Sequence, residues 1–168
     1  GYVTHRNSTG TGMYIAKNAT FDMYSGRIDG NRKESSSYAS VAGIRNEGAF
    51  TMYNGSISNN SLWLSGYWAG VLNNGTFIMH DGIISGNDGQ REAGGVMNGG
   101  TFIMNGGSIT NNTATFGGGV SNSGTFIMNG GSITNNSSGL NKLHRLFTVG
   151  GQENGHCLWE NNTEEGLV

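Results

Sequence analysis

The chain has 168 residues, of which 31 are glycine, none is proline and only 12% are charged, and its formal net charge is −2 at pH 7. No cluster of Lys and Arg provides the electrostatic footprint of a nucleic-acid-binding protein, and no apolar run reaches the roughly 18 residues that span a bilayer. Hydrophobic residues make up 35% of the chain and aromatic residues 10%, at regular spacing, which excludes a disordered linker. We therefore expect an ordered chain that binds no nucleic acid and does not span a membrane.

One segment recurs five times along the chain. Its copies read TFDMYSGRIDGN, AFTMYNGSISNN, TFIMHDGIISGN and, twice, TFIMNGGSITNN. Each copy contains one phenylalanine near its start, and these are Phe21, Phe50, Phe77, Phe102 and Phe126. Successive phenylalanines are 29, 27, 25 and 24 residues apart. A repeat of this length is typical of a solenoid, in which each repeat stacks on its neighbours.

Each repeat predicts three short strands. The first carries an aliphatic residue six positions before the phenylalanine, and these are Ile15, Ile44, Val71, Val96 and Val120. The second carries the phenylalanine and, in each copy, a methionine two positions later, so that both side chains point to one side of the strand. The third carries an isoleucine seven positions after the phenylalanine, and these are Ile28, Ile57, Ile84, Ile109 and Ile133. Stacking of coils about 4.8 Å apart buries these residues. We therefore predict an all-β fold, a right-handed parallel β-helix of about five to six coils with 24–29 residues per coil.

Asparagine occupies two fixed positions in the repeat. The first follows the isoleucine by three residues, and its members are Asn31, Asn60, Asn87, Asn112 and Asn136. The second follows the aliphatic residue by two, and its members are Asn46, Asn73, Asn98 and Asn122, with Lys17 in the first coil. We predict that both sets form turns and that their amides bond coil to coil as ladders. The pairs Gly106-Gly107 and Gly130-Gly131 predict a corner with unusual backbone angles.

The repeat pattern ends near residue 138, which predicts two parts. Residues 1–138 form the β-helix, and residues 139–168 form a non-repeat segment that we expect to cap the open C-terminal end. The single cysteine, Cys157, excludes an internal disulfide, and we interpret it as a small, partly buried apolar residue.

A β-helical polysaccharide lyase or hydrolase needs paired acids, or a Ca²⁺-binding carboxylate cluster, in one column on neighbouring coils. The columns of this chain contain no such pair: Asp22 and Asp29 belong to one coil but to different strands, and most other acids fall in loops or corners. The four histidines share no metal-ligand spacing. We therefore predict no catalytic residue, no metal site and no cofactor.

Aromatic residues gather in the loops that join one coil to the next. Trp63, Tyr67 and Trp68 lie in one loop, Tyr38 lies in the loop one coil earlier, and Phe116 lies in a loop two coils later. Exposed on consecutive loops, these rings would form an edge that stacks on sugar rings or anchors a protein. The alternative is that Trp63 and Trp68 fold back and cover the side of the solenoid.

A family resemblance rests on the run SITNNTATFGGGVSNSGTFIM, from Ser108 to Met128, and on the motif that reads Gly-Gly-Val at residues 94–96 and 118–120. Together with the recurring asparagines, these motifs resemble the repeats of bacterial surface adhesins with β-helical passengers, in particular chlamydial polymorphic membrane proteins. They are also similar to adhesin-like proteins of gut bacteria and methanogenic archaea. The resemblance covers roughly residues 12–138, although the phenylalanine of the family's FxxN motif is Ile109 or Ile133 here. It implies a secreted or cell-surface protein that binds glycans or host molecules.

The sequence therefore favours a non-enzymatic, extracellular or surface-exposed, adhesin-like solenoid that displays a binding edge for a glycan or a protein. A carbohydrate-active lyase or hydrolase is one alternative. An ice-binding protein is another, because the outward-facing Ser and Thr columns could form a flat hydroxyl array. A third alternative is a filament that grows by end-to-end self-association of coils.

Overall fold

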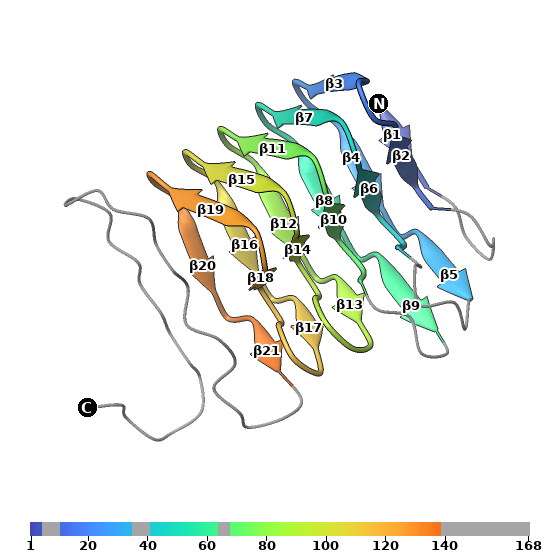
Figure 1. Cartoon of the computed structure of the whole chain (residues 1–168). Coiled ribbons are helices and arrows are strands. Elements are labelled where there is room, and N and C mark those ends of the chain that lie inside the picture. Colours follow the sequence, from blue (N-terminus) through green and yellow to red (C-terminus); the bar gives the residue numbers. More distant parts are fainter. Residues whose placement is uncertain (5–10, 35–40, 64–67, 139–168) are drawn as a thin grey trace, which may run out of the picture.

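The computed structural model describes residues 1–4, 11–34, 41–63 and 68–138, and these residues form stacked parallel coils (Figure 1). All 21 strands of this part of the chain pair in parallel and belong to four sheets. Three sheets have five strands and one has six, which gives a β-solenoid of five coils. The predicted solenoid is confirmed, and the phenylalanines that pair between coils confirm the predicted repeat of 24 to 29 residues.

The four sheets follow one another in every coil. The aliphatic sheet contains β2 (Met13–Ile15), β6 (Ile44–Asn46), β10 (Val71–Asn73), β14 (Val96–Asn98) and β18 (Val120–Asn122). The phenylalanine sheet contains β3 (Thr20–Met23), β7 (Ala49–Met52), β11 (Thr76–Met79), β15 (Thr101–Met104) and β19 (Thr125–Met128). The isoleucine sheet contains β1 (Tyr2–Val3), β4 (Arg27–Asp29), β8 (Ser56–Ser58), β12 (Ile83–Ser85), β16 (Ser108–Thr110) and β20 (Ser132–Thr134). The short sheet contains β5 (Arg32–Glu34), β9 (Ser61–Trp63), β13 (Asp88–Gly89), β17 (Thr113–Ala114) and β21 (Ser137–Ser138).

The prediction of three strands per coil was wrong, because the short sheet adds a fourth. Its strands follow the first set of asparagines and are only two or three residues long. They are held by backbone bonds between coils, such as the one that the Ser61 N–H donates to the Asn31 carbonyl over 2.9 Å. Unlike the other strands, they carry no residue type that recurs from coil to coil, because their second position is occupied in turn by Lys33, Leu62, Gly89, Ala114 and Ser138.

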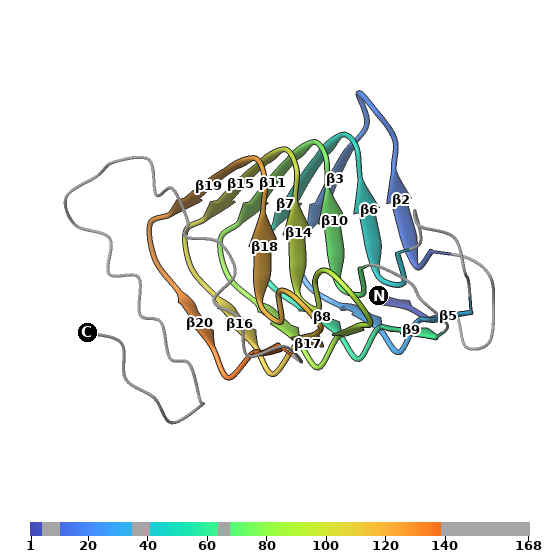
Figure 2. The ribbon, with the colours of Figure 1, turned by 60° about the horizontal axis from the view of Figure 1, so that its bottom comes forward.

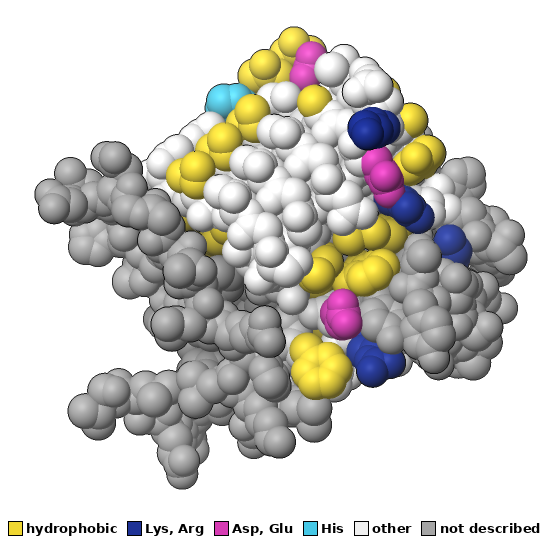
Figure 3. All heavy atoms as spheres, in the orientation of Figure 1, with side chains coloured by type: hydrophobic (Ala, Val, Ile, Leu, Met, Phe, Trp, Pro, Cys, Tyr) yellow, Lys and Arg dark blue, Asp and Glu magenta, His cyan; other side chains and the backbone are white. Residues whose placement is uncertain are grey.

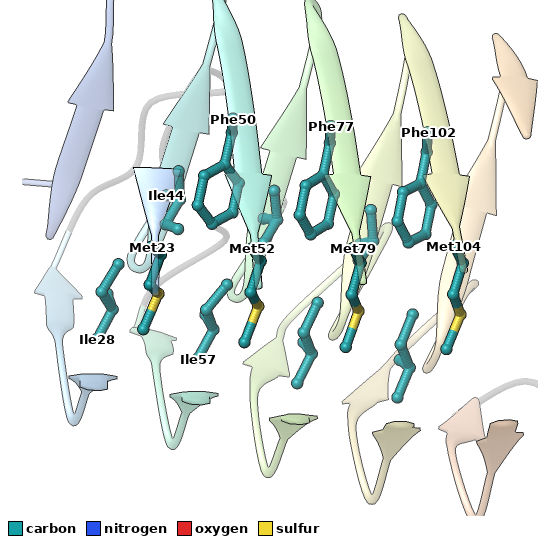
Figure 4. Close-up of a cluster of buried hydrophobic side chains, with 14 of the residues drawn as sticks. Met23, Ile28, Ile44, Phe50, Met52, Ile57, Phe77, Met79, Phe102 and Met104 are labelled. Atoms are coloured by element: carbon teal, nitrogen blue, oxygen red, sulfur yellow. The ribbon is translucent and has the colours of Figure 1, made fainter. Parts of the chain in front are cut away.

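The core lies inside the tube and consists of columns of identical or similar side chains (Figure 4). The rings of Phe50 and Phe77 stack with centroids 4.8 Å apart, and those of Phe77 and Phe102 stack at 4.7 Å. Met52 and Met79 are fully buried beside them. Each coil alone leaves these side chains half exposed, so the stacking of coils provides the hydrophobic stabilisation of the fold.

The first set of asparagines forms a continuous buried ladder, as predicted. The side chain of Asn60 donates from Nδ2 to Oδ1 of Asn87 over 2.8 Å, and Asn87 donates in the same way to Asn112 over 2.9 Å. The same Oδ1 atoms also accept the backbone N–H of the preceding rung, at 3.0 Å for both pairs. Each Nδ2 also donates to a backbone carbonyl of the coil before its own, for example from Asn87 to Ile57 over 3.0 Å. Buried amides are thus satisfied, which removes the usual cost of burying a polar group.

The second ladder runs from Asn46 through Asn73 and Asn98 to Asn122, each Nδ2 donating to the next Oδ1 over 2.7 Å. The prediction that Lys17 occupies this column in the first coil was wrong. Ile15 pairs with Asn46 rather than with Ile44, and Met13 takes the aliphatic position. The cause is the corner between β2 and β3, which contains residues 16–19, whereas the corner between β6 and β7 contains residues 47 and 48 only. Lys17 therefore lies in this corner and not in the ladder column.

Two kinds of corner need a backbone that most residues avoid. Gly107 and Gly131 have φ of 81° and 88°, which confirms the corner predicted from the glycine pairs. The corner before the first ladder uses the residue ahead of the ladder asparagine, with φ of 54° at Asn59 and 55° at Asn111. Asparagine is one of the few residues that adopts this left-handed conformation at low cost.

The expected C-terminal cap, residues 139–168, lies outside the described residues. The part of the chain that the structure describes contains no helix with the length and hydropathy needed to cross a bilayer.

Candidate functional site

The first candidate surface is the loop edge, which comprises the described residues 41–43, 68–70, 90–95 and 115–119 between the short sheet and the aliphatic sheet. Figure 2 shows the strands of the aliphatic sheet side by side, with these loops at their lower ends. Of the five aromatic residues predicted to form a binding edge, the structure describes the side chains of Trp68 and Phe116. Trp63 is the last residue of β9, and its side chain lies outside the description. Tyr38 and Tyr67 lie outside the described residues.

Trp68 is half-buried and tied to the coils on both sides. Its backbone forms single parallel bridges with Val41 in the coil before and with Ala93 in the coil after. Its indole N–H donates to the carboxylate of Glu92 over 3.2 Å. The ring is thus fixed in place by a group on the next loop, with part of its surface in contact with solvent.

Phe116 is 36% exposed and sits on the loop of the fourth coil. Its backbone N–H donates to the Arg91 carbonyl of the third coil over 2.8 Å. The neighbouring Thr115 hydroxyl donates to the Gln90 carbonyl over 2.7 Å. Figure 3 shows exposed hydrophobic, basic and acidic side chains close together on the loops beside β13 and β17. Hydrogen bonds between loops therefore place aromatic and charged groups of successive coils in a row.

A second surface, the corner column, follows the methionines of the phenylalanine sheet. It contains one planar side chain per coil: Tyr24, Tyr53, His80, Asn105 and Asn129. Centroids of the rings of Tyr24 and Tyr53 lie 4.7 Å apart with 1° between the planes, and those of Tyr53 and His80 lie 5.1 Å apart with 9°. Nδ2 of Asn105 lies 3.4 Å from Nδ1 of His80, and Nδ2 of Asn129 donates to Oδ1 of Asn105 over 2.8 Å. All five side chains are exposed, so the column is an external ladder along the whole length of the five coils.

Sequence reasoning missed the corner column. The position three residues after each phenylalanine contains no acid, so it gave no sign of catalytic chemistry. The signal that could have found it is the recurrence of planar side chains at one position in all five repeats, because stacked coils bring equivalent residues into contact.

Charged side chains gather on the N-terminal coils and on the loops, whereas the outer face over β8, β12, β16 and β20 is largely uncharged (Figure 3). The clearest polar cluster surrounds Asp29, which accepts hydrogen bonds from the hydroxyls of Ser58 over 2.7 Å and Tyr2 over 3.0 Å and from Asn59 over 2.9 Å. Desolvation by burial raises the pKa of Asp29, but these hydrogen bonds and the charge of Arg27 outweigh it, so that the pKa lies below its usual value.

None of the strand pairs in the described coils places two acids side by side. The residue that pairs with Asp22 is Thr51, the residue that pairs with Asp29 is Ser58, and Asp88 lies between Ser61 and Thr113. The described residues also contain no group of three or more His, Cys, Asp or Glu side chains placed to hold a metal.

No protein-family model, curated protein or solved structure matches this chain. Among the described residues, two surfaces are candidates for a functional site: the loop edge and the corner column.

Proposed function

We propose that this chain is a non-enzymatic binding module, a rigid solenoid of a secreted or cell-surface adhesin-like protein whose loop edge binds a glycan or a protein. The observation that supports it most is the bonding between loops, from Trp68 to Glu92 and from Phe116 to Arg91. A surface that is already ordered loses little conformational entropy when a ligand binds, so less of the free energy of its contacts is offset by ordering.

The chemistry of the loop edge fits such ligands. Aromatic rings provide large apolar area with few rotatable bonds, and guanidinium and carboxylate groups provide directional hydrogen bonds. Arg91 is exposed and Phe116 is 36% exposed, so both are accessible at the loop surface. The adhesin-like and extracellular parts of the proposal rest on the resemblance of the Gly-Gly-Val motif and the asparagine positions.

A glycan array and a panel of purified extracellular proteins, probed with the wild-type chain, test the proposal. For a ligand that binds, the double variant Arg91→Ala/Phe116→Ala is expected to bind about tenfold or more weakly, because exposed anchors of this type contribute a large share of binding energy. Ile83→Ala is the matched control, since Ile83 is a 47% exposed apolar residue on the outer face of the isoleucine sheet.

Two outcomes contradict the proposal. One is the absence of any ligand on both panels, and the other is a ligand that the double variant binds as tightly as the control does. Steady release of reducing ends or of unsaturated products from pectin, alginate or a host glycan would favour a hydrolase or lyase instead.

A further inference from the structure

The corner column is an ordered row of hydrogen-bonding groups on the outside of the solenoid. Tyr24 is 67% exposed and Tyr53 is 40% exposed, yet their rings are parallel to within 1°. Neither phenol hydroxyl has a hydrogen-bond partner among the described residues. The column thus presents hydroxyl, imidazole and amide groups to solvent, one per coil, at the spacing of adjacent strands, about 4.8 Å.

Stacking decides which part of each ring a ligand can reach. The facing sides of the Tyr24, Tyr53 and His80 rings are covered by one another, so between its ends the column offers ring edges and polar tips. This middle part of the column lacks the apolar pocket or open ring that anchors most protein partners. It also contains no lysine or arginine to neutralise phosphates, as binding to a nucleic acid requires.

We propose that the corner column binds an extended, uncharged polysaccharide that lies parallel to the solenoid axis. Phenol hydroxyls and side-chain amides both donate and accept hydrogen bonds, as sugar hydroxyls do. A β-1,4-linked glucan is an extended ribbon whose successive rings advance by slightly more than one strand spacing, with every second ring turned over. Each coil can therefore meet about one sugar, and successive coils meet hydroxyls on alternate edges of the ribbon.

The proposal does not depend on the loop edge. The two surfaces lie at different corners of the coil, because the column follows the end of the phenylalanine sheet and the loops precede the aliphatic sheet. The column also needs no movement to bind, since its rings and amides are already in contact from coil to coil.

Isothermal titration calorimetry of the whole chain tests the proposal by measuring the dissociation constants of three hexasaccharides: cellohexaose, chitohexaose and maltohexaose. The first two are extended β-1,4 chains, and the third is an α-1,4 chain that coils. We expect binding of at least one extended chain and at least about tenfold weaker binding of maltohexaose, because a coiled chain meets fewer rungs. The double variant Tyr24→Phe/Tyr53→Phe keeps both stacked rings and removes only the hydroxyls, and we expect it to bind about tenfold more weakly.

Tyr14→Phe is the matched control, because Tyr14 is also exposed but lies on the aliphatic sheet beneath the Arg45 guanidinium. The proposal fails if the wild-type chain binds none of the three hexasaccharides, or if the double variant binds as well as the control. Loss of binding in Arg91→Ala/Phe116→Ala with no loss in the tyrosine variant would place the glycan on the loop edge instead. The loop-edge proposal in turn survives a failure of the tyrosine test.

Discussion

The rings of Phe77 and Phe102 lie 4.7 Å apart, centroid to centroid, with only 4° between their planes. Both side chains are fully buried, and each ring has a second ring on its other face. Phe21, at the N-terminal end of the same column, has one stacking partner at 5.8 Å and is half-buried. The column is therefore tighter in its middle than at this end.

This difference predicts unequal costs for the same substitution. Phe77→Ala is expected to lower the free energy of unfolding by about 3–5 kcal/mol, since it opens a cavity between two rings. Phe21→Ala, the matched variant, is expected to cost less than half of that. Urea denaturation followed by circular dichroism measures both values. Equal costs would contradict the stacked column as the main source of stability.

A second prediction concerns the buried asparagine ladder. Asn87→Ala removes the acceptor of two hydrogen bonds from Asn60 and the donor to Asn112. Each buried group left without a partner costs about 1–3 kcal/mol, so a loss of about 3 kcal/mol is expected. Asn129→Ala removes an exposed amide of the same chemistry and is expected to cost less than about 1 kcal/mol. A small effect of Asn87→Ala in urea denaturation would argue that the ladder contributes little.

Two adjacent glycines provide a third test. A Cβ atom on Gly100 would lie 2.1 Å from the Gly75 carbonyl oxygen of the coil before, and neither backbone can move without disturbing the stack. A Cβ atom on Gly99 would lie 3.0 Å from Oδ1 of the Asn74 side chain, which can turn away. Gly100→Ala is therefore expected to cost about 3 kcal/mol or more, and Gly99→Ala less than about 1 kcal/mol. Thermal unfolding of the two variants measures the difference. Similar melting temperatures would contradict the close approach of coils at this corner.

Asp29 and Asp88 predict opposite effects of pH. The pKa of Asp29 is lowered in the fold, so its ionised form stabilises the fold above the unfolded-state pKa of about 3.9, and this contribution is lost as the pH falls through the folded-state value. Asp88 is exposed, but neighbouring atoms partly desolvate its carboxylate and raise its pKa, so its ionised form destabilises the fold at neutral pH, and acidification removes this cost.

At pH 7 we therefore expect Asp29→Asn to lower the free energy of unfolding and Asp88→Asn to raise it. Both differences should shrink when the same urea titrations are repeated near pH 2. Asp22→Asn removes the same charge from the outer face of β3 and serves as the control. A stabilising Asp29→Asn or a destabilising Asp88→Asn would show that the assigned direction is wrong.

The interior of the solenoid was predictable from the sequence, because each core position repeats with one residue type. Phe, Met and Ile recur at fixed offsets, and strands that stack in register must bring equal offsets together. The buried asparagines were predictable for the same reason. In the first coil this logic failed, since Ile15 keeps the expected distance to Phe21 while the two extra corner residues move it into the asparagine column.

The candidate sites were harder to predict, because outward positions vary from coil to coil. The loop aromatics were predicted from residue type and from their position between repeats, and neither reveals that the Trp68 indole donates to Glu92. The corner column was not predicted, because tyrosine, histidine and asparagine belong to different chemical classes. They share only planarity, and that matters once the coils are stacked.

Coils built on Phe102 and Phe126 begin with the same twelve residues, TFIMNGGSITNN, and pair in one register. A tandem copy of residues 101–124 would meet, on either side, neighbours of the kind that it already has. Duplication of the coding sequence for one coil would therefore lengthen the solenoid by one turn, and the added coil would use the same coil-to-coil contacts. The distance between the two ends of the solenoid would then change in multiples of one coil.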